Sequence, residues 1–577
     1  MSQAPNSQDA LVFGPQDTVL AALERAAQAY PDRIISVFDG RGQNSESRLC
    51  KDMLGHARVM ARKYAAWGVK PGDRVIICLI NNWDWFDAWV GAIALGALPV
   101  AVSPGVSLGA SAYLRDKIKD VADMLDARLV ICGAHLVDLL MEPQAGTESK
   151  GTQAITFAQL SAANCKEGDL PFHASQASDT AFLQLTSGST GRSRAVEISN
   201  AALLHNIQAT QRAINSAPGA KSVSIASYWL PLFHDFGLVM SLGAILSGVN
   251  LRLYQPRTFL ARPAVWLGDL GGDENAISAT PNFGLQHCSA RVDDADLEGL
   301  DLASCQTVVV AAEMVQPQAV RSFTDRFGAF GLSPQAVKPA YGLAEATLIV
   351  TMDTKGEGLR TARVPTTPQS KELVETVCCG APLKDTLVRV VGPDGTELHD
   401  GQVGAIQVNG PGVFSRYFKD AETSAAAFRD GYLITGDLGC MIDGELYVTG
   451  RTKDILIVRG ENHMPHDLER LAEAETGGGN ARAGAFSVLV SDQVEQSCLV
   501  VELMRDQHGR APEIDRLLRR KIAAELGLTI DNLIFVPTGT IPRTTSGKIR
   551  RDPLRKAFLE GHLEQVRISV QTQVGRR

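Results

Sequence analysis

Short apolar runs alternate with helix-forming stretches along the chain up to about residue 340. Residues 74–80 are almost entirely apolar after Arg74, which predicts a buried strand, and residues 83–95 predict a helix. Further strands are expected at residues 99–103, 128–132, 181–185, 223–227 and 307–311, with helices such as residues 201–214 between them. Strands that alternate with helices pack as a layered α/β fold with mostly parallel sheets, and this is the fold class that we expect.

The rest of the chain follows a different pattern. Residues 387–391 and 405–409 are strand-like runs flanked by turns, so we expect a β-rich part there. Residues from about 454 predict a separate small α+β unit, with strands at 455–458, 485–490 and 498–503. The clearest helix of this unit has one apolar face, made of Ile514, Leu517, Leu518, Ile522 and Leu526.

The composition excludes several classes of protein. Apolar residues make up 45% of the 577 residues and charged residues 21%, which predicts a soluble globular chain of several subdomains. The net charge of −8 argues against nucleic acid as a main partner but is compatible with nucleotide binding. Ten cysteines without the spacing of a zinc site predict reduced thiols and a cytoplasmic location.

The sequence favours neither a signal peptide nor a transmembrane helix. Residues 1–9 are polar and lack the apolar core of a signal peptide. Residues 88–114 contain no charged residue, yet Pro99, Pro104 and four glycines interrupt them. A buried helix, then a strand, then a loop explains this stretch better than a spanning helix, so we expect no transmembrane segment.

A lysine near the end of the chain is the strongest candidate for catalysis. Lys548 lies in a segment rich in Gly, Ser and Thr, residues 542–550. A long cationic side chain on such a loop can reach a phosphate and a carboxylate together and offset the charge that develops as they react. Taken alone, Lys548 is more often a surface lysine in a basic loop.

A second loop of phosphate-binding composition lies far upstream, after the strand predicted at residues 181–185. It consists of Thr186, Ser187, Gly188, Ser189, Thr190 and Gly191. Its glycines let the backbone approach an anion, and its hydroxyls and amides can donate to phosphate oxygens. It is not a Walker loop, because no Gly-Lys-Ser/Thr follows, and by itself it is more often an ordinary loop.

Two further segments carry candidate nucleotide ligands. In residues 340–347, Tyr341 can stack on a purine and Glu345 can hold Mg²⁺ between phosphates; the alternatives are a core tyrosine and a solvated glutamate. Asp437 can accept ribose hydroxyls, or it is a turn aspartate, and Arg451 can bind ribose or phosphate, or it is part of a surface ion pair.

Together and in this order, these segments resemble the adenylate-forming superfamily of acyl-CoA synthetases, peptide-synthetase adenylation domains and luciferases. The resemblance extends from about Val19 to Phe558. It implies a large N-terminal domain, residues 1–452, and a small mobile C-terminal domain, residues 453–577. It also implies that ATP and Mg²⁺ convert a carboxylate to an acyl adenylate and that the acyl group then passes to a thiol.

The same resemblance assigns roles to individual residues. Lys548 matches the adenylation lysine, and Lys453 matches the hinge between the two states of the enzyme. The nucleotide-binding residues implied in addition to those above are Glu313, Ala340 and Gly342.

A narrower resemblance is to fatty acyl-AMP ligases. Residues 229–238, Trp-Leu-Pro-Leu-Phe-His-Asp-Phe-Gly-Leu, carry it most clearly, and residues 203–206, 279–283 and 459–467 fit it as well. It implies a fatty or other carboxylic acid as substrate, an acyl carrier protein as acceptor, and a role for His234 at the phosphate or acyl carboxylate. The alternative for His234 is a packed histidine that caps a helix.

Three departures from the pattern stand out. Arg194 replaces the usual lysine after the phosphate loop, and Met464 replaces a tyrosine. The polar segment between Leu348 and Cys378 is longer than in ordinary acyl-CoA synthetases but short for the insertion that characterises fatty acyl-AMP ligases. An acyl- or aryl-CoA synthetase is therefore kept as the nearest alternative function. A non-catalytic homologue that binds nucleotide and a partner is a further alternative, although it would be expected to lack Lys548 or Glu345.

Overall fold

The computed structural model describes residues 12–14, 16–105, 111–141, 152–165, 172–187, 193–216, 221–272, 274–370, 373–452, 456–458, 461–476, 482–491, 494–526, 528–543 and 549–566. All structural statements below concern these residues. The expected layered α/β fold is confirmed: two mostly parallel sheets lie among helices, and β-rich and α+β parts follow them.

The largest sheet has nine strands. In spatial order they are β17 (Ala381–Pro382), β14 (Ile349–Met352), β13 (Val337–Gly342), β12 (Cys305–Val310), β11 (Ala276–Thr280), β9 (Ile225–Tyr228), β10 (Asn250–Leu253), β1 (Ile34–Phe38) and β2 (Asn44–Leu49). The six strands from β13 to β1 are parallel, and the outer pairs are antiparallel.

The second sheet has six strands and carries the phosphate-loop segment. Its order is β6 (Gln153–Ile155), β5 (Ala127–Cys132), β3 (Arg74–Cys78), β4 (Leu98–Ala101), β7 (Thr180–Ser187) and β8 (Ser193–Ser199). All pairs are parallel except the β7–β8 hairpin, in which Thr186 lies opposite Arg194.

Helices cover both sheets. They are α1 (Val19–Ala29), α2 (Met53–Ala66), α3 (Trp83–Leu95), α4 (Ser111–Leu125), α5 (Ala134–Met141), α6 (Phe157–Ala162), α7 (Asn200–Asn215), α8 (Asp235–Leu246), α9 (Pro256–Ala261), α10 (Pro263–Asp269), α11 (Asn282–Arg291) and α12 (Pro317–Gly328). The expected helix 83–95 is confirmed as α3. It begins where the Asn82 side chain accepts from the Trp85 amide and ends at Gly96, whose φ is +84°.

A third, antiparallel sheet forms the β-rich part. It contains β18 (Leu387–Val391), β19 (Gly404–Asn409), β21 (Tyr432–Ile442), β20 (Phe428–Arg429) and β22 (Glu445–Arg451). Helix α13 (Ala421–Ala426) precedes β20, and a separate hairpin is made of β15 (Thr361–Pro365) and β16 (Leu373–Val377). This hairpin occupies the long polar segment noted between Leu348 and Cys378.

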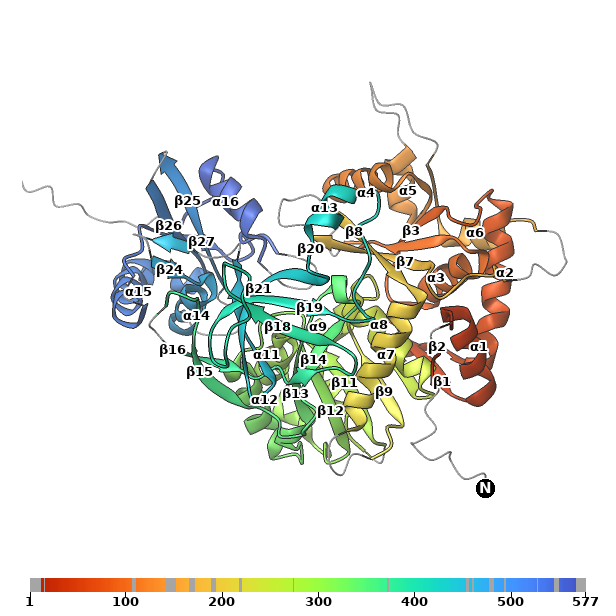
Figure 1. Cartoon of the computed structure of the whole chain (residues 1–577), viewed down its shortest axis with the longest axis horizontal. Coiled ribbons are helices and arrows are strands. Elements are labelled where there is room, and N and C mark those ends of the chain that lie inside the picture. The colour runs from red at the N-terminus through yellow and green to blue at the C-terminus, as the bar shows by residue number, and fades with distance from the viewer. Residues whose placement is uncertain are drawn as a thin grey trace, which may run out of the picture.

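The C-terminal elements gather at one end of the molecule (Figure 1). They are β23 (Leu456–Val458), β24 (Glu461–His463), α14 (Pro465–Glu475), β25 (Ala483–Ser491), β26 (Val494–Leu503), α15 (Ala511–Leu526), β27 (Asn532–Pro537) and α16 (Arg551–Leu559). Their apolar side chains form a separate cluster that includes Leu468, Val501 and Leu518. Met464 is an exception, because it is fully buried among Val364, Leu438 and Tyr447 of the preceding part.

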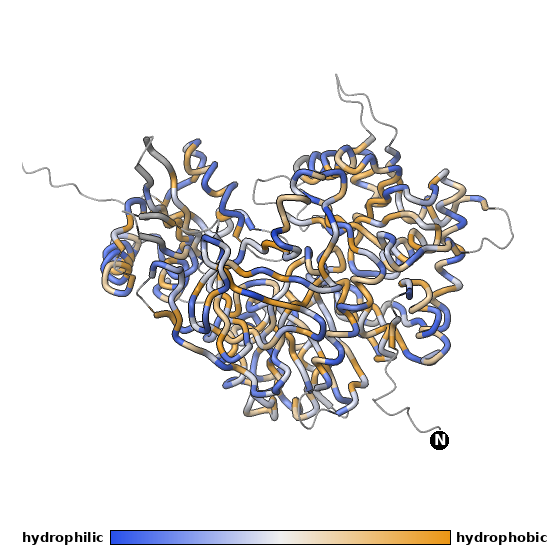
Figure 2. The backbone as a smooth tube through the Cα atoms, in the orientation of Figure 1, coloured by the Kyte–Doolittle hydropathy of each residue, from blue (hydrophilic) through white to orange (hydrophobic). Residues whose placement is uncertain are grey.

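The uncharged stretch 88–114 includes parts of α3, β4 and the start of α4. A loop was expected at the end of this stretch, and this was wrong at Leu114, which lies in α4. Within the described part of the chain, no helix is long and apolar enough to cross a membrane. Figure 2 shows that hydrophilic and hydrophobic stretches are interleaved along the backbone.

Candidate active site

Most of the candidate residues that the structure describes lie at or after the carboxyl ends of parallel strands. Thr186 lies at the end of β7, His234 follows β9, Glu313 follows β12, and Tyr341 and Gly342 end β13. Ligands of open α/β sheets bind at this edge, so the fold brings these residues toward one region.

Several predicted residues lie outside the described part of the chain. They are Gly188, Ser189, Thr190 and Gly191 of the phosphate loop, the hinge candidate Lys453, and Lys548. For Ser187 the backbone is described as part of β7 and the side chain is not.

His234 occupies the N-cap position of α8, and its side chain makes no capping hydrogen bond. The preceding carbonyl, that of Phe233, accepts a hydrogen bond of 3.2 Å from the Gln184 side chain on β7. The turn also requires Gly237, because a Cβ there would approach the Pro231 carbonyl oxygen to 2.2 Å. His234 therefore lies at the amino end of a 12-residue helix, where anions are favoured, and directly after a carbonyl that is bonded to the phosphate-loop strand.

Asn81 fixes this turn from the other sheet, a role that the sequence analysis did not identify. Its side-chain amide donates to the carbonyls of Leu230, at 2.9 Å, and Tyr254, at 3.0 Å. Its side-chain oxygen accepts from the amide of Leu232 at 2.9 Å. The only signal in the sequence is an asparagine directly after a strong apolar run, which is too common to predict such a contact.

Glu345 lies on a tight turn with strained backbone. Two residues later, Thr347 has φ +69°, a value that β-branched residues rarely adopt. Its hydroxyl donates to the Gly412 carbonyl at 2.7 Å, and the Asn206 side chain of α7 donates to the carbonyls of Ala346 and Ile349. Contacts from two distant segments thus hold the turn that presents the Glu345 carboxylate.

Tyr417 connects Glu345 with the end of the phosphate loop. Its hydroxyl donates to Oε1 of Glu345 at 2.9 Å, and the guanidinium carbon of Arg194 lies 5.5 Å from the centre of its ring. Tyr417 is bridged to Val196 of β8, and the amide of Phe418 donates to the Ala195 carbonyl at 2.8 Å. The substitution of lysine by arginine at 194 therefore places a cation beside the aromatic ring that contacts the candidate metal ligand.

Burial of Tyr417, together with the charge of Glu345, raises the pKa of its hydroxyl well above the ordinary value. The hydroxyl consequently keeps its proton at any physiological pH and acts as the donor to Glu345. The sequence analysis missed Tyr417, since nothing in the local pattern distinguishes it from a core tyrosine.

Tyr341, Asp437 and Arg451 form a hydrogen-bonded chain. The Tyr341 hydroxyl donates to Oδ2 of Asp437 at 2.6 Å, and Nε of Arg451 donates to Oδ1 at 2.9 Å. Asp437 is only 5% exposed, whereas the Arg451 side chain is 63% exposed. Burial and Asp437 raise the pKa of Tyr341 well above its ordinary value, so this hydroxyl is also a permanent donor.

Glu313 follows Ala312, whose φ of +72° bends the chain sharply after β12. Its Oε1 accepts from the amide of Phe283 at 3.2 Å, at the start of α11. Phe283 in turn meets Trp229 edge to face, with ring centres 6.5 Å apart, and Trp229 stacks on Phe259 at 3.9 Å. Two of the segments that carry the resemblance to fatty acyl-AMP ligases, residues 229–238 and 279–283, thus contribute to one aromatic cluster.

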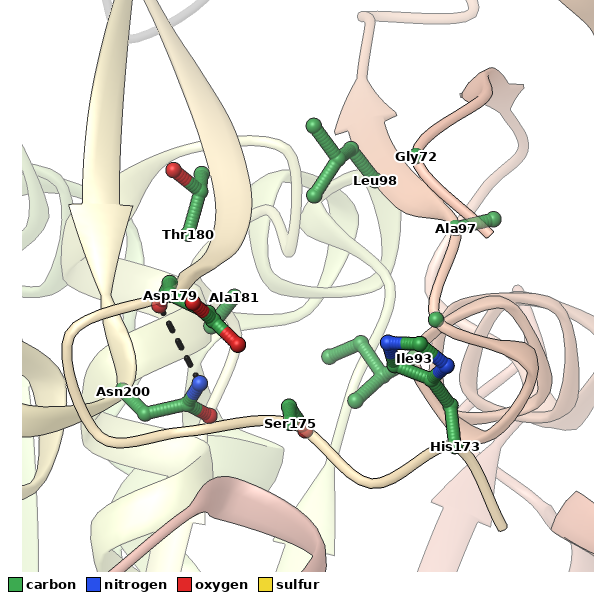
Figure 3. A pocket seen from close by; sticks show the side chains of 11 residues that line it. Gly72, Ile93, Ala97, Leu98, His173, Ser175, Asp179, Thr180, Ala181 and Asn200 are labelled. Carbon is green, nitrogen blue, oxygen red and sulfur yellow. Dashed lines mark hydrogen bonds between the residues drawn. The ribbon is translucent and has the colours of Figure 1, made fainter. Parts of the chain in front are cut away.

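A pocket of about 240 Å³ lies at the opposite end of β7 (Figure 3). Thr180, at the start of the strand, lines it, whereas Thr186 lies at the strand's far end, about 20 Å away at the usual rise per residue. Polar groups in its wall are engaged within the protein: the Asn200 amide donates to the Asp179 carbonyl, and the Thr180 hydroxyl donates to Glu197. This pocket is separate from the candidate active site.

Comparison with known proteins identifies the relatives of the chain. The AMP-binding enzyme family matches residues 23–418. The chain is 33% identical to a long-chain-fatty-acid–AMP ligase, FadD26, of Mycobacterium marinum over 88% of this chain and 90% of that protein. It is 32% identical to a 4-hydroxyphenylalkanoate adenylyltransferase of Mycobacterium bovis over 95% of this chain and 93% of that protein.

The fold has a close counterpart among solved structures. A structure from a study of fatty acyl-adenylate ligases from E. coli and L. pneumophila superposes with a TM-score of 0.84. The superposition covers 94% of this chain and 98% of that chain at 26% identity.

Proposed function

The chain belongs to the AMP-binding enzyme family, and from this premise we propose that it activates a fatty carboxylic acid with ATP. A carboxylate oxygen of the acid attacks the α-phosphorus of ATP, the bond from that phosphorus to the bridging oxygen of the β-phosphate breaks, and pyrophosphate leaves. The product is an acyl adenylate. The observation that carries this proposal is the link from Arg194 through Tyr417 to Glu345, which joins the phosphate-loop hairpin to a carboxylate suited to a metal.

The residues present fit a magnesium-bound nucleotide. Mg²⁺ is commonly held by one or two carboxylates together with substrate phosphates, and Glu345 offers one carboxylate beside the phosphate-loop hairpin. A metal ion bound there would neutralise phosphate charge. The loop from Thr186 to Gly191 would hold the departing pyrophosphate, and Lys548 would offset charge at the reacting oxygens.

The remaining site residues have roles in orientation. Asp437, whose carboxylate accepts from Tyr341 and Arg451, would accept ribose hydroxyls, and Glu313, Ala340 and Gly342 would line the nucleotide. His234, at the amino end of α8, would bind the carboxylate or the α-phosphate.

We further propose that residues 1–452 and 453–577 act as two domains, with Lys453 as the hinge. Lys548 and the loop at 186–191 belong to different domains under this division, so adenylation requires them to close on one substrate. The separate apolar clusters on the two sides of the proposed boundary support this division.

The proposed acyl acceptor is the phosphopantetheine thiol of an acyl carrier protein in the cytoplasm. Free CoA must be bound through its nucleotide phosphates, which requires unpaired cations near the junction. Arg516, Arg519, Arg520 and Lys521 of α15 are the basic residues that could bind such phosphates, and two of the four are already engaged, because Arg519 pairs with Asp515 at 3.1 Å and Lys521 pairs with Glu475. A carrier protein instead supplies binding energy through its own surface.

A trapping assay tests the proposal. Purified protein is given ATP, Mg²⁺ and fatty acids of graded length, with free CoA or with a holo acyl carrier protein, and pyrophosphate and acyl products are measured. We expect pyrophosphate release, acyl adenylate in the presence of free CoA, and acyl transfer when the carrier is added. Rapid stoichiometric acyl-CoA formation would instead identify an acyl-CoA synthetase, and absence of pyrophosphate with every acid would contradict the adenylation itself.

A further inference from the structure

The turn that carries His234 belongs to the nine-stranded sheet. It runs from Trp229, directly after β9, to His234, the N-cap residue of α8. The amide of His234 donates to the Pro231 carbonyl at 3.1 Å, and the amide of Leu238 donates to the His234 carbonyl at 3.0 Å. These bonds fix the local shape of the turn, whereas its position relative to the six-stranded sheet requires contacts from that sheet.

Asn81 supplies the first of these contacts. It lies three residues after the end of β3 in the six-stranded sheet, and only 2% of it is exposed. Its side-chain amide donates to the carbonyls of Leu230, in the turn, and of Tyr254, which follows β10. Its side-chain oxygen accepts from the amide of Leu232, also in the turn. Since β9 and β10 are neighbours, one side chain joins the ends of two strands of the other sheet.

This pattern of two donations and one acceptance accounts for an asparagine at position 81. A side-chain amide has two N–H donors and a carbonyl oxygen, whereas a carboxylate has no donor and an aliphatic side chain has neither group. All three hydrogen bonds of Asn81 are buried, so a backbone group that lost its partner would carry a desolvation penalty. Loss of the Asn81 amide therefore favours a shift of the turn.

Gln184 supplies the second contact, from β7. Its side-chain amide donates to the Phe233 carbonyl, directly before His234, at 3.2 Å. Gln184 is 4% exposed and lies two residues before Thr186, where the phosphate-loop segment begins. The strand that leads into the phosphate loop is therefore bonded to the backbone on the N-terminal side of His234.

We propose that Asn81 and Gln184 are positioning residues for His234. Together they fix its turn against β3 and β7 and so set where the imidazole meets the reacting carboxylate or phosphate. The proposal rests on the proposed function, in which His234 binds one of these groups. Neither amide touches the substrate in this scheme, so their effect on adenylation is expected to act through His234 and to vanish when the imidazole is removed.

A double-mutant cycle with His234→Ala tests this dependence. Pyrophosphate release gives kcat/KM for the fatty acid that reacts fastest in the graded series, since this ratio reports transition-state stabilisation. Asn81→Ala is expected to lower kcat/KM about tenfold, because small misplacements of reacting groups cost this much or more. In the His234→Ala background the same change is expected to cost less than about twofold, which is the usual scatter of independent effects.

Asn200→Ala is the matched control for the loss of a buried asparagine. Asn200 is also 2% exposed, and its side chain likewise makes two donations to backbone carbonyls and one acceptance from a backbone amide, at the opposite end of β7. We expect both single variants to lower the melting temperature and only Asn81→Ala to lower kcat/KM per folded molecule. Equal losses of kcat/KM in Asn81→Ala and Asn200→Ala, or a loss from Asn81→Ala that persists in the His234→Ala background, would overturn the proposal.

Gln184→Leu is a second variant, which removes one hydrogen bond and keeps a side chain of similar size. The same cycle with this variant applies even where Asn81→Ala does not fold. Loss of the single hydrogen bond is expected to lower kcat/KM about threefold in the wild-type background and to have no effect in the His234→Ala background. An equal loss in both backgrounds would contradict a role through His234.

A further measurement does not depend on turnover. Carbethoxylation of the half-buried His234 by diethyl pyrocarbonate is followed by mass spectrometry on the full-length protein, with the exposed His562 as the internal reference. The ratio of the two rates is expected to rise at least about twofold in Asn81→Ala and Gln184→Leu, because a turn with fewer bonds opens more often, and to be unchanged in Asn200→Ala. An unchanged ratio in Asn81→Ala and Gln184→Leu would overturn the positioning role. If wild type releases no pyrophosphate with any acid, the proposed function fails while the labelling ratio still decides the positioning role.

Discussion

The phenol hydroxyl of Tyr417 donates a hydrogen bond of 2.9 Å to Oε1 of Glu345, a residue 72 positions earlier in the chain. The guanidinium of Arg194, which is on the second strand of the phosphate-loop hairpin, lies over the ring of the same tyrosine. One side chain therefore couples the loop proposed to hold pyrophosphate with the carboxylate proposed to hold Mg²⁺. Arg194, Glu345 and Tyr417 belong to segments that are far apart in the sequence.

Tyr417→Phe is expected to slow adenylation about tenfold, because a hydrogen bond to a charged group contributes about 1.5–3 kcal/mol and its loss frees the orientation of the carboxylate. Pyrophosphate release with a saturating acid measures the effect. Tyr432→Phe is the matched control, since Tyr432, on β21, also lies against an arginine, with the guanidinium carbon of Arg389 3.9 Å from the centre of its ring. Equal rates for the two variants would contradict a role of Tyr417 in orienting Glu345.

Glu345→Gln is expected to raise the Mg²⁺ concentration needed for half-maximal adenylation and to lower the maximal rate. The amide keeps the acceptor for Tyr417 but loses the negative charge that the metal requires. Titration of the rate with Mg²⁺ at fixed ATP distinguishes the two effects. An unchanged Mg²⁺ dependence would remove Glu345 from the metal site.

Lys548→Ala is expected to abolish acyl-adenylate formation, with a loss of about 10²–10³ in rate, while ATP binding and the melting temperature change little. Lys556→Ala provides the control, because Lys556 lies on α16 with a largely exposed side chain. Acyl transfer from preformed adenylate to the carrier should persist in both variants. Wild-type pyrophosphate release by Lys548→Ala would show that another group acts in its place.

The stability of the protein is expected to depend on pH through Glu473. Burial and the neighbouring charge of Glu469 raise its pKa to about 7 in the folded chain, and the pKa returns to 4.5 on unfolding, so between these values the folded state retains a proton that the unfolded state has lost. The unfolding free energy contributed by this group therefore falls as pH rises from about 4.5 to 7, by on the order of 3 kcal/mol.

Glu473→Gln lacks this titration and should melt at a higher temperature than wild type at pH 8, with a smaller difference at pH 5. Thermal unfolding at both values measures it, with Glu475→Gln as the reference. A constant difference in melting temperature across the range would contradict the assigned pKa.

Periodicity in the sequence predicted the elements well where a strand is buried on both faces. The expected strand at residues 74–80 is β3 (Arg74–Cys78), of which four residues are buried, and the expected helix at residues 83–95 is α3. These predictions succeeded because an unbroken apolar run, or an apolar helix with a capping asparagine, specifies its conformation within a few neighbours. The loop expected at the end of residues 88–114 was wrong at Leu114, because α4 starts after a Gly- and Ser-rich stretch whose composition is typical of a loop.

The candidate site was predicted only as a set of segments. Thr186, His234, Tyr341, Glu345, Asp437 and Arg451 were each recognisable by residue type and by their order along the chain. Their partners were not: Tyr417 for Glu345, Asn81 for the His234 turn and Tyr341 for Asp437. Such contacts join residues 72 to 151 positions apart, and no local pattern encodes them.

By itself, the sequence determined the α/β class, the identity of the chemical groups and their order, because hydrophobic period and side-chain chemistry are local properties. Only the tertiary structure decided which groups meet. Packing of the sheets brought Tyr417 between Arg194 and Glu345 and placed Arg543 among the carboxylates of α14 and β26. Burial at those meeting points then set the pKa of Tyr417 and Glu473, since the free energy of a charge depends on the solvent and the charges that the fold places around it.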